Sequence, residues 1–246
     1  MRRRVNRTYS SRVATVLGNP ARFEYMARGW RRHPHRPRRV LPAPAPTTAR
    51  GLEEIILGRR STRDFGGGPL RLDQLSRLLG GSYGIVDRKP LDRTGRVQPL
   101  RPVPSGGALY PLEIYPLVVA GQDLEPGVYH YDVPGHGLEL LRPRADVAAF
   151  LEEIGVPDNV RGFAAVFVLT AVFERTLFKY SDRGYRFVLL DAGHVAQNLC
   201  LLASACGLGA VCLGGFYDDE VNALVGADGV DESAVYMVAV GTPADE

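Results

Sequence analysis

A lysine followed by a tyrosine, in the segment FKYSDRGYR (178–186), has the residue types that a proton transfer needs. Lysine is rare in this chain, because Lys89 and Lys179 are the only two among its 30 basic residues. Arginine does not lose its proton in a protein, whereas burial or a neighbouring cation lowers the pKa of a lysine. Lys179 and Tyr180 are therefore candidate catalytic residues, with a chance placement of the lysine as the alternative.

The neighbours of Lys179 favour a lowered pKa if the segment is helical. Arg175 and Arg183 then lie one turn before it and one turn after it on the same face. Repulsion from both guanidinium groups, together with burial, favours the neutral amine, which can act as a base. Tyr180 could donate or relay a proton beside it.

A second candidate site is the loop RRSTRDF (59–65), which follows an expected helix at 52–60. Guanidinium forks and hydroxyls in one loop suit a phosphate group. A solvated turn explains the same residues equally well. The candidate phosphate ligands are Arg59, Arg60, Ser61 and Arg63.

Two glycine pairs complete the set of candidates, one in PSGGALYPLEIY (104–115) and one in GLGAVCLGGF (207–216). Glycine has no side chain, so backbone groups in such loops can approach a flat ligand closely. A simple turn is the alternative for each pair. The candidate residues are Pro104, Ser105, Gly106, Gly107, Gly214 and Gly215.

Several other chemistries lack their motifs in this sequence. GxGxxG, the Walker pattern, HExxH and a Cys/His metal cluster are all absent. His194 lies on an apolar helical stripe with Leu190 and Leu201, which favours a core or dimer-interface histidine over a catalytic base. A phosphate-bearing, ring-bearing cofactor is the best common account of the three loops.

Composition indicates one large globular domain with a basic arm. The chain has 246 residues, 45% of them hydrophobic, and a net charge of +3. Residues 1–50 hold 13 arginines and one acidic residue, Glu24, and their Pro/Arg-rich end is typical of an arm or linker. We expect a tail or partner interface at 1–50, in preference to a nucleic-acid site, and a folded domain at 51–246.

The three cysteines match no metal motif or disulfide framework, which favours a reduced, cytoplasmic protein. No apolar run has the length of a membrane span, and no secretory signal is recognisable. Hydrophobic periodicity predicts an α+β fold. Helices are expected at 52–60, 72–80 (ended by Gly80 and Gly81), 146–154 and 218–225, with one broken helix or two successive helices at 174–206. Strands are expected at 112–120, 127–132, 138–143, 164–173, 211–213 and 234–240, and a functional or mobile loop at 84–104.

In this order and with these gaps, the motifs resemble the nitroreductase-like flavoproteins, from about Gly51 to Thr242. More closely they resemble the SagB-type dehydrogenases, the flavin oxidases of azoline-containing peptide natural products. The resemblance implies FMN as cofactor, a central mostly antiparallel sheet flanked by helices, and an intertwined homodimer with each flavin at the interface. It assigns 59–63 to the flavin phosphate, 104–107 to the loop from the partner subunit, and 214–215 to the reactive edge of the ring.

The resemblance also implies a reaction, in which a peptide thiazoline or oxazoline is oxidised to the azole. Lys179 and Tyr180 stand where the family has its catalytic pair. Ala108 and Tyr110 replace an Asn and a Gln of general nitroreductases, which puts polar contacts to the flavin in doubt there. Rival readings are an NAD(P)H-dependent nitro or quinone reductase, a cyclic-dipeptide desaturase, and a non-catalytic binding protein that uses the basic arm. A complex with a cyclodehydratase is a further expectation.

Overall fold

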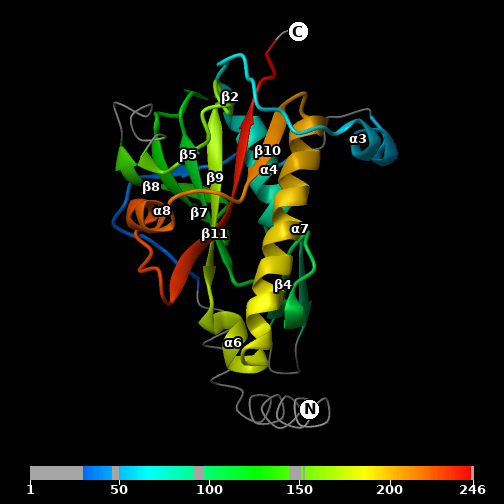
Figure 1. Cartoon of the computed structure of the whole chain (residues 1–246). Helices are drawn as coiled ribbons and strands as arrows, with labels where there is room; N and C mark the ends of the chain where they lie inside the picture. Colours follow the sequence, from blue (N-terminus) through cyan, green and yellow to red (C-terminus); the bar gives the residue numbers. More distant parts are fainter. Residues whose placement is uncertain (1–29, 46–49, 91–96, 144–150, 152, 245–246) are drawn as a thin grey trace, which may run out of the picture.

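A seven-stranded antiparallel sheet forms the centre of the molecule (Figure 1). The computed structural model of the chain describes residues 30–45, 50–90, 97–143, 151 and 153–244. The strand order, with its bounds, is β1 (Arg38–Val40), β8 (Gly137–Pro143), β7 (Gly127–Asp132), β5 (Leu112–Val118), β9 (Ala165–Val172), β11 (Glu232–Gly241) and β10 (Gly209–Leu213). Two small sheets join β2 (Leu70–Arg71) to β6 (Gly121–Gln122) and β3 (Asp87–Pro90) to β4 (Val97–Leu100).

Helices cover both faces of the large sheet, so its central strands are buried on both sides. The described helices are α3 (Leu52–Gly58), α4 (Leu72–Tyr83), α6 (Glu174–Tyr180), α7 (Arg183–Ala205) and α8 (Asp218–Val225), with a 3-10 turn η1 (Gly106–Ala108). Residues of α4 and α7 pack in one apolar cluster, and residues of α8 pack in the cluster on the other face. This explains why β5 and β9 are buried along both faces and do not alternate between buried and exposed residues. The α+β prediction and the helix-flanked antiparallel sheet are confirmed.

The structure differs from the expected elements at two places, the end of the helix at 72–80 and the loop at 84–104. Helix α4 does not end at Gly80 but runs on to Tyr83, because its glycines are packing contacts. A Cβ on Gly80 would lie 2.8 Å from the side chain of Pro44, and one on Gly81 would lie 2.9 Å from that of Leu202. The expected loop 84–104 contains the β3–β4 hairpin. The two successive helices expected within 174–206 are confirmed as α6 and α7, and the backbone reverses between them at Ser181, where φ is +50°.

Part of the expected arm belongs to the sheet. Arg38–Val40 pair with β8 as an edge strand, Leu41 is buried, and Trp30 packs on the apolar core. The linker interpretation is therefore wrong for 38–40, while the division of the chain at residue 50 stays a prediction. Residues 1–29 and 46–49, and most of the expected helix 146–154, lie outside the described residues.

By length and composition α7 could cross a membrane, and no other helix in the described part of the chain meets that criterion. The core helices of globular domains meet it too. Helix α7 packs against α4 and against β10 and β11. Its apolar character is therefore explained by the core that it covers.

Candidate functional site

Lys179 and Tyr180 lie in the last turn of α6 and point at the glycine loop. A Cβ built on Gly107 would be 2.6 Å from the Lys179 amine nitrogen and 2.6 Å from the Tyr180 hydroxyl oxygen. Gly107 is exposed, Lys179 is half-buried and Tyr180 is buried. The structure thus brings together two of the segments that the sequence singled out, 178–186 and 104–115.

Burial lowers the pKa of Lys179 below its usual value, as the sequence predicted. The two arginines do not cause the shift, so that part of the prediction was wrong. The guanidinium of Arg175 is 2.6 Å from a carboxylate oxygen of Glu113, which compensates its charge. Arg183 begins α7 after the backbone reversal at Ser181, so it does not continue the helical face of Lys179.

The glycine loop is held in a strained conformation by polar contacts. Gly107, Ala108 and Tyr110 have φ of +68°, +52° and +48°, a backbone region that residues other than glycine rarely adopt. The Tyr110 N–H donates to the Ser105 hydroxyl at 2.9 Å, and the Gln98 amide donates to the Ala108 carbonyl at 3.0 Å. Backbone strain that is held in place by such contacts is typical of functional loops.

Asp191 of α7 also holds this loop, and sequence analysis missed it. Burial raises the pKa of Asp191 to about 6, against hydrogen bonds from the Ser105 hydroxyl and the Gly106 backbone N–H. The carboxyl group therefore changes charge near neutral pH directly beneath the loop. Its position between Val188 and Val195, on the apolar stripe of α7, was a signal that this carboxyl is buried.

Replacing Gly107 with alanine is expected to displace the Lys179 and Tyr180 side chains and to destabilise the fold by about 1–2 kcal/mol. The new methyl group would overlap both polar atoms, and φ at this residue is positive. Urea denaturation measures the cost, with Gly193→Ala as the control, because a Cβ there meets nothing within 4 Å. Equal stabilities of the two variants would contradict the crowding at Gly107.

The arginine loop lies at the other end of α7, beside β10. The Thr62 N–H donates to the Ala210 carbonyl at 3.0 Å, which fixes the loop against the sheet. Among the described residues, Arg59 and Arg63 form no ion pair with an acidic side chain. Arg60 instead donates to two backbone carbonyls, that of Leu57 at the end of α3 and that of Arg59. The free cations of this loop fit an anionic group such as a phosphate.

Gly214 and Gly215 follow β10 and leave open space. A Cβ on Gly215 would meet nothing within 4 Å, and one on Gly214 would meet only the ring of Tyr236, at 3.8 Å. Both glycines are exposed. The charge of Arg59 acts on the thiol of Cys212, two residues before the pair, so the arginine loop and these glycines border one region.

Within one chain, α7 separates these two halves of the candidate site. On α7, Asp191 contacts the glycine loop that faces the Lys-Tyr pair, and Cys200 contacts Cys212 beside the arginine loop. Nine residues of helix place these two residues about 14 Å apart along the axis and on opposite sides of the helix. A ligand that touches both halves would therefore need the second half from another copy of the chain.

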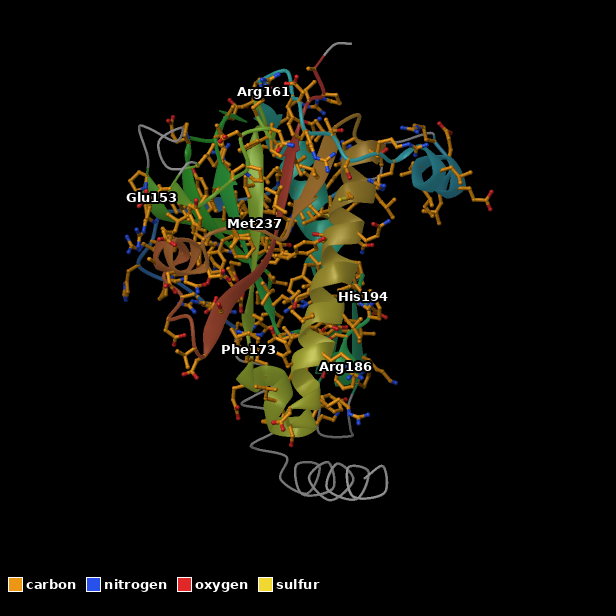
Figure 2. The ribbon with its side chains drawn as sticks, viewed as in Figure 1. Glu153, Arg161, Phe173, Arg186, His194 and Met237 are labelled. Atoms are coloured by element: carbon orange, nitrogen blue, oxygen red, sulfur yellow. The ribbon has the colours of Figure 1, made fainter. Side chains whose placement is uncertain are left out.

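The remaining sequence candidates have structural roles. Tyr83, Tyr110 and Tyr115, three tyrosines that could have lined a substrate channel, are buried in the core. His194 is exposed on α7, so the core alternative for it was wrong (Figure 2). Its Nδ1 lies 3.3 Å from the Pro104 carbonyl, which makes it a further contact of the glycine loop.

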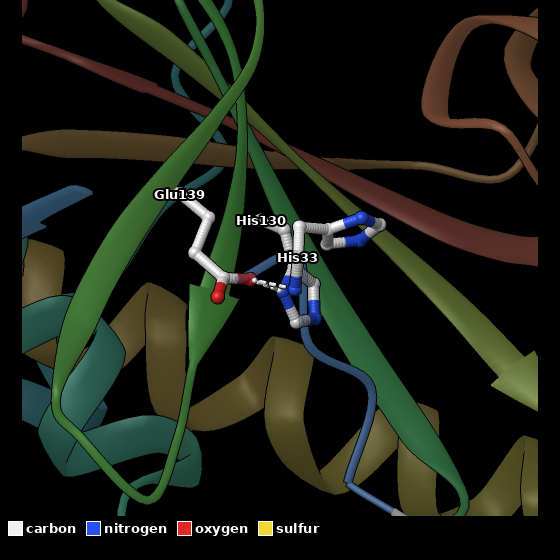
Figure 3. A group of neighbouring side chains, drawn as sticks. All are labelled: His33, His130 and Glu139. Atoms are coloured by element: carbon white, nitrogen blue, oxygen red, sulfur yellow. Dashed lines mark hydrogen bonds and ion pairs between the residues drawn. The ribbon is translucent and has the colours of Figure 1, made fainter. Parts of the chain in front are cut away.

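A buried ion network behind α6 was invisible to sequence analysis. The His130 ring lies between two carboxylates, 2.9 Å from Glu139 and 3.0 Å from Glu113 (Figure 3 shows the first). His33, His130 and Glu139 each offer one ligand atom, and these three atoms lie within 4.8 Å of one another, close enough for a metal ion. Both nitrogens of His130 already face carboxylate oxygens, which favours an imidazolium. Burial lowers the pKa of His130, but the two carboxylates outweigh it and the net pKa is raised.

Acid is expected to unfold the protein partly through Glu113. Burial acts to raise the pKa of this carboxyl, but Arg175 and His130 bring it down from 4.5 to about 2. A depressed pKa contributes stability above the unfolded value that is lost as the pH falls, here about 3 kcal/mol between pH 4.5 and 2. Urea denaturation from pH 7 to pH 3 should show about 2 kcal/mol of this loss in the wild type and in Glu54→Gln, an exposed control. Glu113→Gln should show a shallower loss, and parallel curves would contradict the assignment.

Comparison with known proteins places the site in a family. The model of the Nitroreductase family matches residues 56–242. A nitroreductase-like protein of Methanocaldococcus jannaschii is 36% identical over 182 residues, which are 71% of this chain and 83% of that protein. The microcin B17-processing protein McbC of Escherichia coli is 34% identical over 164 residues, which are 62% of this chain but only 55% of that protein.

Solved structures agree on the fold. A nitroreductase-like protein of Ralstonia eutropha has a TM-score of 0.68 at 27% identity, over 85% of this chain and 90% of that one. A chain of the Escherichia coli microcin synthetase McbBCD complex, with truncated pro-MccB17 bound, has a TM-score of 0.64 at 23% identity, over 96% and 94%. The family match spans the large sheet from β5 onward, α7 and both halves of the candidate site, and the chain therefore belongs to the Nitroreductase family.

Proposed function

We propose that this protein is an FMN-dependent dehydrogenase of the SagB type, which oxidises a thiazoline or oxazoline in a peptide to the azole. The observation that carries the proposal is the convergence of Lys179 and Tyr180 on Gly107. A plain flavin reductase does not need a half-buried lysine with a lowered pKa at this place. The sequence relationship to the microcin B17-processing protein supports a role in peptide natural-product processing.

The residues of the arginine loop and the second glycine pair fit an FMN molecule. Arg59, Ser61 and Arg63 would hold its phosphate, because the two cations carry no acidic partner among the described residues. Gly214 and Gly215 would let the ring approach the backbone, because they leave open space. When bound, FMN would supply the chemistry of accepting a hydride from the substrate.

The protein's own contribution would be to position the azoline and to remove its proton. A half-buried lysine with a lowered pKa is neutral more often than an exposed one. Its amine can therefore take the proton from the azoline carbon adjacent to the carbon that gives up the hydride. The hydroxyl of Tyr180, which faces the same glycine, would hold the substrate or relay the proton. The strained loop 104–108 keeps both groups at one place.

The proposal includes a homodimer in which each site takes residues from both copies. The two halves of the site lie on opposite sides of α7 in one chain, which supports this arrangement. Exposed apolar side chains on α3 and α7 offer a surface for it, namely Leu52, Ile56, Leu57, Tyr185, Leu189 and Leu190. A complex with a cyclodehydratase, which would supply the azoline, is a further part of the proposal. The microcin synthetase complex contains a chain of this fold.

An NAD(P)H-dependent reductase of nitro compounds is the second candidate, because the relative from Methanocaldococcus jannaschii is a nitroreductase-like protein. The open space at Gly215 would also accept a flat nitroarene. Lys179 has no part in that reaction. The two functions therefore differ in whether they need this lysine.

The test begins with the visible spectrum of the purified protein and the mass of the released chromophore. A flavin spectrum and the mass of FMN are expected. The protein is then given a synthetic thiazoline-containing peptide with oxygen, and the product is expected to be lighter by about 2 Da, the mass of two hydrogens. Oxidation of NADPH with a nitroarene, without any reaction of the peptide, would favour the reductase. A protein that binds no FMN would overturn both.

A further inference from the structure

Two thiols touch each other away from the Lys-Tyr pair. The Sγ atom of Cys200, on α7, lies 3.6 Å from the Sγ atom of Cys212, on β10. A disulfide bond is about 2.05 Å long, so the two sulfurs are in van der Waals contact and reduced. They need to move closer by about 1.5 Å to bond. Both belong to the three free cysteines of the chain.

The surroundings divide the roles of the two thiols. Cys200 is buried, whereas Cys212 is partly exposed and can meet a small molecule from solvent. Hydrogen bonds from Cys200 and from the Tyr236 hydroxyl favour the thiolate of Cys212, and the positive charge of Arg59 adds to them. The pKa of the Cys212 thiol is lowered by these contacts, and that of Cys200 is raised by the same pairing and by burial. Cys212 is therefore the nucleophile and Cys200 the thiol that follows.

We propose that Cys212 and Cys200 form a peroxide-reactive dithiol site, which is oxidised by hydrogen peroxide to a disulfide between α7 and β10. The Cys212 thiolate attacks one peroxide oxygen, the O–O bond breaks, and hydroxide leaves and is protonated to water. The Cys200 sulfur then attacks the sulfenic acid sulfur, so the S–S bond forms and the S–O bond breaks. The released hydroxide takes the Cys200 proton as a second water, and two thiols have been oxidised by one peroxide.

Cys206 is the internal control, because it shares the helix end but not the pair. It is partly exposed, and its Sγ accepts a hydrogen bond from Arg77 at 3.7 Å. If exposure alone made a thiol reactive towards peroxide, Cys206 would react as fast as Cys212. The proposal does not depend on the substrate of the flavin site, because it needs only the two sulfurs, Tyr236, Arg59 and peroxide.

The test uses the full chain as purified, treated with one equivalent of hydrogen peroxide and then denatured for thiol counting. Free thiols are expected to fall from three to one per chain, and the intact mass to fall by about 2 Da. Peptide mapping is expected to join the Cys200 and Cys212 peptides. Cys206→Ser is expected to form the same disulfide as the wild type, and no free thiol is left because this variant has only Cys200 and Cys212. Three surviving thiols, or a product that requires Cys206, would overturn the proposal.

Three further variants test the division of roles. Cys200→Ala is expected to stop at the sulfenic acid of Cys212, which dimedone traps, and Cys212→Ala is expected to lose the fast reaction altogether. Tyr236→Phe is expected to slow thiol loss at pH 7 by roughly two- to fivefold and to match the wild type at pH 9, where the thiolate forms without help. A pH-independent effect of Tyr236→Phe would overturn the assigned role of its hydroxyl. Mapping of the wild-type disulfide needs no variant, so a variant that fails to fold does not block the test.

Discussion

Lys179→Ala is expected to lower the rate of azoline oxidation by a factor of about 10² to 10⁴, the usual contribution of a positioned acid or base. The amine is half-buried and faces Gly107 together with the Tyr180 hydroxyl. Alanine removes the group that takes the proton but leaves the arginine loop and Gly214–Gly215 unchanged. The flavin content is therefore expected to stay at the wild-type level.

The matched control is Lys89→Ala, because Lys89 is the other lysine of the chain and is exposed on β3. Its rate is expected to equal that of the wild type. Lys179→Arg keeps the positive charge but cannot release a proton, so it is expected to be nearly as slow as alanine. The measurement is the single-turnover rate of flavin reduction by a thiazoline peptide, as a function of pH. Full activity of Lys179→Arg would show that the site needs a cation there and not a base.

Arg175→Met is expected to reduce the free energy of unfolding by about 3–5 kcal/mol, because it leaves a buried carboxylate without its main partner. Arg175 and Glu113 are both buried, and their charged atoms lie 2.6 Å apart. His130 alone would then compensate two carboxylates, those of Glu113 and Glu139. Because Arg175 also ties α6 to β5, the Lys179 and Tyr180 side chains at the end of this helix are expected to lose their positions.

Arg161→Met is the control for this prediction, since the same substitution there breaks an exposed ion pair. The Arg161 guanidinium is 3.0 Å from the Asp64 carboxylate, and both side chains are exposed. Exposed pairs contribute about 0–1 kcal/mol, so the two variants should differ by several kcal/mol in urea denaturation at pH 7. Similar losses for the two variants would show that the buried network contributes little to stability.

Sequence alone predicted the elements that depend on local pattern. The strands at 112–120, 127–132 and 164–173 and the helices at 52–60 and 218–225 were found within a few residues, because their apolar periodicity and their turn residues are local signals. The helix end at Gly80 was wrong for a tertiary reason. Gly80 lets α4 approach Pro44, and Gly81 lets it approach Leu202. In the sequence, such packing glycines cannot be distinguished from glycines that end a helix.

In the candidate site, too, some residues were predicted from the sequence and others were found only in the structure. Residue types selected Lys179, Tyr180, the arginine loop and both glycine pairs, because rare or clustered residue types are visible in a list of letters. Asp191 left only the signal of a carboxyl on an apolar stripe. Gln98 left no signal, because its role is a hydrogen bond to Ala108, ten residues away in a loop.

What only the tertiary structure decided is which distant groups meet. The register of β5, β7 and β8 places Glu113, His130 and Glu139 side by side, and the packing of α7 on β10 brings the Cys200 and Cys212 sulfurs into contact. The amine of Lys179 meets Gly107, 72 residues earlier in the chain, and the reversal at Ser181 places Arg183 on a different helix from Lys179. Local sequence fixes backbone preference over one or two turns, whereas these contacts depend on strand register and helix packing, which the whole core determines at once.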